Sequence, residues 1–262
     1  MTTGKWDDLL PRLASAVAMV GIGALGVWLG GLWFHALISV VVGLMVWELV
    51  TMLDTARNRS ALILGVASGA AAMVAIELPA SFALPLLLIP SMLGLGRMEN
   101  GGVTYAVFTA LIQLAGYGLM ALRDDFGLTW MVWLLLVVVV TDIAGYFAGR
   151  LIGGPKLWPR VSPKKTWSGT VAGWAGSAVL AVMFAGATKA GAGLIGVSVA
   201  VSMASQIGDI AESAIKRRSG VKDSSNLIPG HGGLLDRFDG MLGAAIFIVI
   251  AGQLIGFPPG SE

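Results

Sequence analysis

Cysteine is absent from the 262 residues of the chain, and charged residues make up only 12% of them. The absence of cysteine excludes disulfide bonds and thiolate metal sites. A soluble globular domain carries about 25% charged residues, so this chain has too little charge for that class. Its net charge of +2 is also too small to indicate a nucleic-acid partner. Composition therefore favours a membrane protein.

Hydrophobic residues make up 56% of the chain and gather in long uncharged runs. A helix needs about 17–25 apolar residues to cross a bilayer, and the bilayer core forces backbone groups to pair within the segment. The sequence therefore predicts an all-α polytopic membrane protein with about nine transmembrane helices. They are expected near residues 13–29, 32–53, 61–76, 80–95, 103–122, 128–147, 170–187, 192–211 and 240–257. The alternative of a cleaved signal peptide at the first run is disfavoured, because a second span follows almost at once.

The basic residues indicate an orientation for these spans. With a cytoplasmic N-terminus, only Arg123 and Lys189 of the 17 Lys and Arg residues lie outside. Cytoplasmic segments are enriched in Lys and Arg, so this orientation is predicted. The inside set is Lys5, Arg12, Arg57, Arg59, Arg97, Arg150, Lys156, Arg160, Lys164, Lys165, Lys216, Arg217, Arg218, Lys222 and Arg237. Two basic loops, residues 148–169 and 216–239, then face the cytoplasm together and are expected to form the active site.

The 37 glycines and the positions of the motifs lead to expectations about oligomeric state and domain organisation. Glycine lets membrane helices approach closely, so a homodimer is one expectation. We expect a single integrated membrane domain, with N-terminal helices in residues 1–130 and a catalytic region in residues 131–262. The lack of a targeting extension favours a bacterial cytoplasmic (inner) membrane.

The loop of residues 216–239 is the densest polar segment. The helix that enters it carries Asp209, Glu212, Ser213 and Lys216 within one arc of about 100°. A run of Gly, His and Gly follows at residues 230–233, and such a run frees backbone amides for close approach to a ligand. Each feature has a plainer interpretation: Glu212 and Lys216 could be a surface pair, and the acids at 236 and 239 could favour a helix N-terminus. Together, acids beside cations are typical of a metal-bridged polyphosphate site.

The loop of residues 148–169 repeats this pattern. Lys164, Lys165 and Thr166 precede a glycine-rich helix start, which is a candidate anion site. A lysine pair at a membrane face can also bind anionic headgroups without specificity. Asp142 lies in an apolar span, where a carboxylate is costly and a functional role is the first interpretation. Weaker candidates of the same kind are Glu48, His35 and Gln113.

These residues resemble the phosphatidate cytidylyltransferase (CDP-diacylglycerol synthase) family. Its signature reads here as Ser213, Lys216-Arg217, Lys222-Asp223, His231-Gly232-Gly233 and Asp236-Arg237-Phe238-Asp239. Two further segments are similar to the family: residues 142–150, with a small pair inverted, and residues 162–167. Ser168 stands where the family more often has Glu or Gln. The resemblance covers the C-terminal half; the first 130 residues match only as generic spans.

The resemblance implies transfer of CMP from CTP to phosphatidate, giving CDP-diacylglycerol and pyrophosphate. It implies that Mg²⁺, with or without a second divalent ion, binds at Asp209, Asp236 and Asp239. Expected catalytic residues are Asp209, Ser213, Lys216, Asp223, Asp236 and Asp239. Expected substrate-binding residues are Asp142, Lys164, Lys165, Thr166, Arg217, Lys222, His231, Gly232 and Gly233. CTP, phosphatidate and membrane lipids are the expected partners.

Three other functions share parts of this pattern. A lipid kinase shares the membrane, metal and nucleotide requirements and is the runner-up. A transporter would use Asp142 in a pathway, but the polar residues crowd one face and paired broken helices are not apparent. A CDP-alcohol phosphotransferase would carry an Asp-Gly-x-x-Ala-Arg signature, which this sequence lacks.

Overall fold

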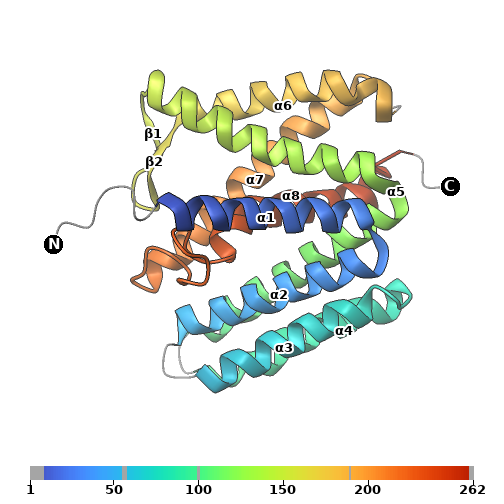
Figure 1. Cartoon of the computed structure of the whole chain (residues 1–262), viewed down its shortest axis with the longest axis vertical. Helices are drawn as coiled ribbons and strands as arrows, with labels where there is room; N and C mark the ends of the chain where they lie inside the picture. The colour runs from blue at the N-terminus through green and yellow to red at the C-terminus, as the bar shows by residue number, and fades with distance from the viewer. Residues whose placement is uncertain (1–8, 55–57, 99–100, 189, 260–262) are drawn as a thin grey trace. The chain divides into compact units, whose positions relative to one another are not determined.

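The computed structural model describes residues 9–54, 58–98, 101–188 and 190–259. Lys5, Arg57 and Lys189, which entered the charge count, lie outside these residues. The helices are α1 (Leu9–Leu29), α2 (Gly31–Leu53), α3 (Asn58–Ala75), α4 (Ala80–Leu95), α5 (Gly102–Leu151), α6 (Trp167–Thr188), α7 (Gly193–Arg218) and α8 (Leu235–Ile255) (Figure 1). Within the described chain, six of them are long and apolar enough to cross a membrane, and α3 and α4 are shorter apolar helices. The chain is therefore an all-helical polytopic membrane protein; nine spans and the orientation stay predictions.

One helix contains a break that the apolar runs indicated. Gly127 lies inside α5 with φ 81° and ψ −170°, values that are not helical. A positive φ is open to glycine at little cost because it has no Cβ. Helix α5 therefore consists of two helical segments that meet at Gly127, in agreement with the two separate runs predicted at 103–122 and 128–147.

The helices pack into two compact units, each of which is built from segments distant in sequence. The first unit contains Met1–Gln113 and Ser219–Arg237, and the second contains Leu114–Arg218 and Phe238–Glu262. In the first, α2 packs on α1 and α3, and α3 packs on α4. In the second, α6 packs on α7. The predicted domain boundary near residue 130 stays a prediction.

Close helix packing in the first unit depends on glycine. A Cβ on Gly43 would lie 2.9 Å from the Gly65 carbonyl oxygen, and one on Gly69 would lie 2.8 Å from that of Ser39. Real Cβ atoms do not come so near, so α2 and α3 approach closely only because these positions lack side chains. The buried core beside this crossing includes Val46 and Leu49.

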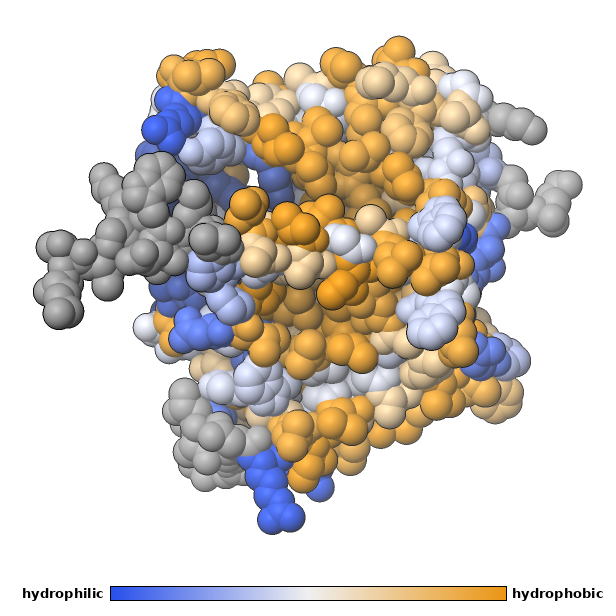
Figure 2. Space-filling model, viewed as in Figure 1, coloured by the Kyte–Doolittle hydropathy of each residue, from blue (hydrophilic) through white to orange (hydrophobic). Residues whose placement is uncertain are grey.

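Large apolar side chains cover the outer surfaces of the helices. Figure 2 shows hydrophobic residues along the helices on the visible face and hydrophilic residues toward helix ends. Val20 and Met183 are examples, with 72% and 74% of their surface exposed. A water-soluble monomer rarely exposes contiguous apolar patches of this kind, whereas lipid chains solvate them.

The loop of residues 148–169 folds in a way the sequence analysis did not predict. Strands β1 (Lys156–Trp158) and β2 (Ser162–Thr166) pair antiparallel, with Lys156 opposite Thr166 and Trp158 opposite Ser162. The hairpin leads directly into α6 and packs against its start. Its short strands carry charged and proline residues in place of an apolar alternation, so the usual period-2 signal is missing.

Candidate functional site

A cavity of about 480 Å³ lies within the second unit. Helix α5 supplies Asp142 and Arg150 to its wall, β2 supplies Lys165, and α7 supplies Asp209. The full lining is Thr141, Asp142, Gly145, Tyr146, Gly149, Arg150, Lys164, Lys165, Thr166, Gly169, Thr170, Gln206 and Asp209. The structure thus brings together Asp142, the lysine pair and Asp209, which the sequence analysis had placed on separate segments.

Two of the residues that line this cavity form an ion pair between strand β2 and helix α7. Lys165 Nζ lies 2.7 Å from Asp209 Oδ2, and both side chains are partly buried. The Ser213 hydroxyl, one turn further along α7, donates a hydrogen bond to Asp209 Oδ1 at 3.3 Å. Asp209 is therefore held through both oxygens, by one residue predicted to bind substrate and one predicted to be catalytic.

The polar face of α7 continues away from Asp209 into the helix bundle. Ser202 accepts a hydrogen bond from Thr141 at 2.7 Å, and Gln206 accepts one from the Trp174 indole at 3.0 Å while donating to the Thr170 carbonyl at 3.2 Å. Sequence reasoning missed Ser202 and Gln206. Gln206 lies three residues and Ser202 seven residues before Asp209, so both share its helix face, and that spacing was a signal that could have found them.

Asp239 lies on α8 next to the polar face of α7. A Cβ on Gly208 would overlap the Asp239 carbonyl oxygen, so glycine permits the two helices to cross at this point. Asp239 is half-buried and interacts electrostatically with Asp209 and Asp142, which repel it, and with Lys216, which attracts it. Asp239 therefore lies within electrostatic range of two other carboxylates, one on α7 and one on α5.

Lys216 belongs to a buried ion pair. Its Nζ lies 2.5 Å from Glu212 Oε2, and the two side chains are 11% and 0% exposed. The interpretation of this pair as an ordinary surface contact is wrong, because burial removes both groups from solvent. Breaking a pair of this kind by removing one partner is strongly destabilising.

Thr166 and Ser168 organise the start of α6. Thr166 is buried, and its hydroxyl accepts the Gly169 amide at 3.3 Å, as an N-cap residue does. The Ser168 hydroxyl donates to the Gly153 carbonyl and lies 3.0 Å from the Thr166 hydroxyl. The departure from the family pattern at Ser168 therefore has a local structural role here, while substrate contact by Thr166 stays a prediction.

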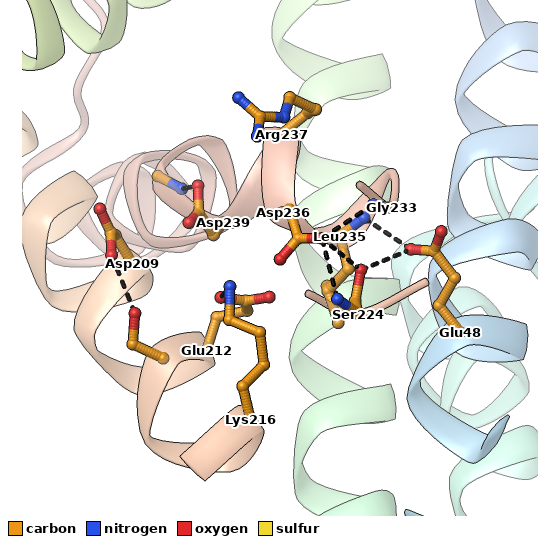
Figure 3. A network of polar contacts seen from close by, with 12 residues as sticks. Glu48, Asp209, Glu212, Lys216, Ser224, Gly233, Leu235, Asp236, Arg237 and Asp239 are labelled. Carbon is orange, nitrogen blue, oxygen red and sulfur yellow. Dashed lines mark hydrogen bonds and ion pairs between the residues drawn. The ribbon is translucent and has the colours of Figure 1, made fainter. Parts of the chain in front are cut away.

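A second polar cluster lies within the first unit, in the loop of residues 219–234 (the glycine loop). Asp236 Oδ2 accepts the amides of Ser224 and Gly233, at 2.9 and 2.8 Å, and lies 2.9 Å from the Ser224 hydroxyl (Figure 3). Gly232, with φ 82°, makes the turn that delivers these amides. Asp236 thus fixes the loop with one oxygen.

The glycine loop also contacts α1, through Pro229 and His231. His231 Nδ1 lies 2.9 Å from the Ser15 hydroxyl, which also lies 3.0 Å from the Pro229 carbonyl oxygen. The Arg237 guanidinium donates to the His231 carbonyl at 3.1 Å. The contact with Ser15 was not predicted, because its partners Pro229 and His231 lie 214 and 216 residues later in the chain.

The remaining predicted residues are solvent-facing. Lys222 and Asp223 are exposed on the glycine loop, and Arg217 is exposed in the last turn of α7. Lys164 is exposed on β2, at the wall of the cavity. Lys164 at the cavity wall and Lys222 on the glycine loop are thus exposed cations that an anion can reach.

The carboxylates of the second unit fit a divalent cation by donor chemistry. Asp209 and Asp239 are oxygen donors of the kind Mg²⁺ prefers, and a cation would relieve their mutual repulsion. Among the residues described, no three acidic or histidine side chains group tightly enough to hold an ion as they stand. Asp236 is the third expected ligand, but its Oδ2 is engaged by the glycine loop. Its metal role stays a prediction.

A family match and three similar proteins all carry a cytidylyltransferase name. Residues 10–255 match the Cytidylyltransferase family. A protein of Brucella suis named phosphatidate cytidylyltransferase is 38% identical over 266 residues, which cover 96% of each chain. Proteins of the same name from Bacillus subtilis and Haemophilus influenzae are 42% and 44% identical over 45% and 46% of this chain, and these stretches cover 45% and 44% of the relatives. With a family match over nearly its whole length and a relative matched from end to end, the chain belongs to the cytidylyltransferase family.

Proposed function

We propose that the chain transfers CMP from CTP to phosphatidate, giving CDP-diacylglycerol and pyrophosphate. The observation that carries this proposal is the cavity of the second unit, where the Lys165–Asp209 pair lies among basic and acidic side chains. A nucleotidyltransferase needs such a mixture because it must hold a polyphosphate and a metal together. Membership of the family and the names of the relatives support the same reaction.

The attacking group needs little activation. A phosphate monoester has a second pKa near about 6, so phosphatidate is largely ionised at neutral pH. The task is to bring two polyanions together and to stabilise charge on the α-phosphate and the leaving pyrophosphate. Lys164 and Lys165 line the cavity wall, and we propose that they contact phosphate oxygens there. Asp209, held by Lys165 and Ser213, keeps the ammonium of Lys165 in place before substrate arrives.

The expected Mg²⁺ would be held by Asp209 and Asp239, where it supplies charge neutralisation for the phosphates. The His231 imidazole of the glycine loop lies 2.9 Å from the Ser15 hydroxyl, which restrains its ring. We propose that His231 orients substrate and is not a general base, because an ionised phosphate needs none.

We further propose that the basic loops face the cytoplasm, where CTP is available, in a bacterial cytoplasmic membrane. The acyl chains of phosphatidate remain in the bilayer, against the apolar outer surfaces of the helices. The positive-inside pattern of the sequence supports this orientation.

The test uses purified protein in liposomes that contain phosphatidate, with Mg²⁺ and CTP labelled on either the α- or the γ-phosphate. We expect label in the lipid only from the α-phosphate, and none after addition of EDTA. Lipid label from the γ-phosphate would show a lipid kinase and contradict the proposal. A folded, metal-supplied protein that labels lipid from neither position would return a transporter to consideration.

A further inference from the structure

Glu48 is a fully buried carboxylate outside the cavity and outside the signature. It lies in α2, one of the candidate membrane spans, with 0% of its surface exposed. Ionisable groups in such segments are costly and are commonly functional. From the sequence, Glu48 is a weaker candidate than Asp142. Its partners, however, all belong to the glycine loop and the start of α8.

The two oxygens of Glu48 face hydrogen-bond donors in the same unit. The Leu234 amide donates to Oε1 at 2.8 Å, and the Leu235 amide donates to Oε2 at 2.7 Å. The Ser225 hydroxyl donates to Oε1 at 2.6 Å, and the Ser224 hydroxyl lies 3.3 Å from Oε2. In Figure 3, the Glu48 side chain points from α2 toward Ser224 and Leu235. Backbone amides at the start of a helix have no partner within it, so Glu48 satisfies donors that α8 cannot.

Asp236 also binds the glycine loop, at residues next to those that contact Glu48. Asp236 Oδ2 accepts the Ser224 and Gly233 amides, so Ser224 lies between the two carboxylates. A Cβ on Gly233 would lie 2.6 Å from Glu48 Oε1, which shows how closely the turn is pressed against α2. The His-Gly-Gly turn is therefore fixed by an acid from α2 and an acid from α8.

We propose that Glu48 is a positioning residue for CMP transfer. It sets the conformation of the glycine loop and the first residues of α8, and it does not touch substrate. This inference rests on the proposed function for its catalytic consequence, while the fixing of the turn stands on the contacts alone. A carboxylate suits this task because both of its oxygens accept hydrogen bonds, and four donors face them here.

Glutamine at this position tests the requirement for a carboxylate. Each Glu48 oxygen accepts a hydrogen bond from one backbone amide. A backbone N–H can only donate, whereas a hydroxyl can donate or accept. The Glu48→Gln side chain must therefore set its NH₂ against either the Leu234 or the Leu235 amide. The size and shape of the side chain are nearly unchanged, so packing alone gives no reason for an effect.

We expect Glu48→Gln to lower kcat by roughly 10- to 100-fold, the worth of a hydrogen bond to a charged group, with KM for CTP within about threefold of wild type. Hydrogen exchange of the same preparation, measured by mass spectrometry, should quicken at residues 224–235 and stay unchanged in α3 and α4. The matched control is Glu77→Gln, the same change at a side chain that is 69% exposed in the same unit. We expect that control to leave both readouts at wild-type values.

Several outcomes would overturn the inference. Wild-type kcat and exchange in Glu48→Gln would mean that the carboxylate does not fix the turn, and faster exchange throughout α3 and α4 would mean a general folding role. Should Glu48→Gln yield no folded protein, Ser225→Ala removes one donor without altering buried charge. We expect Ser225→Ala to lower kcat several-fold with faster exchange at residues 224–235, and no change in either would reject the proposal. A wild-type protein inactive with CTP would refute the proposed function, while the exchange data would still decide whether Glu48 fixes the turn.

Discussion

At the residue scale, the charged groups of the second unit work as restrained pairs. Lys165 contacts Asp209 at 2.7 Å, and Lys216 contacts Glu212 at 2.5 Å. The first pair lines the cavity and is partly accessible, whereas Glu212 is fully buried. Lys165 is therefore the cation best placed to exchange its carboxylate partner for a phosphate oxygen, and Lys216 is held inside the protein.

Replacing Lys165 tests whether its ammonium contacts a phosphate of CTP or only adds to the positive charge of the hairpin. We expect Lys165→Met to lower kcat/KM for CTP by about 100- to 1000-fold, the usual loss when one stabilising donor is removed from an active site. Steady-state kinetics with CTP measures this loss. The matched control is Lys156→Met on β1 of the same hairpin, where the exposed lysine lies outside the cavity lining. Equal losses in both variants would show that only the charge of the hairpin matters.

If the Asp239 carboxylate binds Mg²⁺, its loss should change the Mg²⁺ concentration that the enzyme needs for activity. We expect Asp239→Asn to raise the Mg²⁺ concentration for half-maximal activity by about tenfold or more, since loss of a ligand weakens the site. A Mg²⁺ titration at saturating CTP measures this shift. An unchanged midpoint would remove Asp239 from the metal site.

At the element scale, glycine decides which helices approach closely enough to place these residues. Gly208 allows α7 to cross α8 beside Asp239, and Gly43 and Gly69 allow α2 to approach α3. The apolar runs predicted the helices and their ends to within several residues. The runs did not predict the hairpin of β1 and β2, because its residues are polar and its register depends on packing against α6.

The two alanine variants Gly208→Ala and Gly196→Ala test the crossing on a single helix. A Cβ at Gly208 would overlap the α8 backbone, whereas one at Gly196 meets nothing within 4 Å. We expect Gly208→Ala to cost about 1–3 kcal/mol of stability, as overpacking does. It should also lower turnover through displacement of Asp239, while Gly196→Ala keeps wild-type activity and unfolding temperature. Thermal unfolding in detergent and the lipid-labelling assay measure both effects, and equal behaviour of the two variants would contradict a tight crossing.

The site shows why some positions were predictable and others were not. Lys165 was singled out in the segment of residues 162–167, and Asp209 on the polar face of the helix that enters the second loop. The sequence predicted both residues as candidates but did not predict their contact. Glu48 and Ser15 were ranked low or missed, because their roles come from contacts with a loop about 180–215 residues later. Local spacing carries no information about such long-range partners.

At the scale of the whole molecule, orientation in the membrane determines which face meets CTP. The chain has no cysteine, so single cysteines can be introduced without removing native ones. We expect Arg160→Cys, between β1 and β2, to react with a membrane-impermeant thiol reagent only when the cytoplasmic face is exposed. Asp124→Cys, beside the break in α5, should react only from the opposite face. Labelling of both from the same face would contradict the predicted topology.

The most direct test of the central claim is the stoichiometry of the products. Purified protein, phosphatidate liposomes, CTP and Mg²⁺ are incubated, and lipid-bound CMP and released pyrophosphate are quantified in the same sample. Cleavage between the α- and β-phosphates predicts one pyrophosphate for each CDP-diacylglycerol formed. Release of CDP with a phosphorylated lipid, and no pyrophosphate, would contradict CMP transfer and the reading of the cavity as a nucleotidyltransferase site.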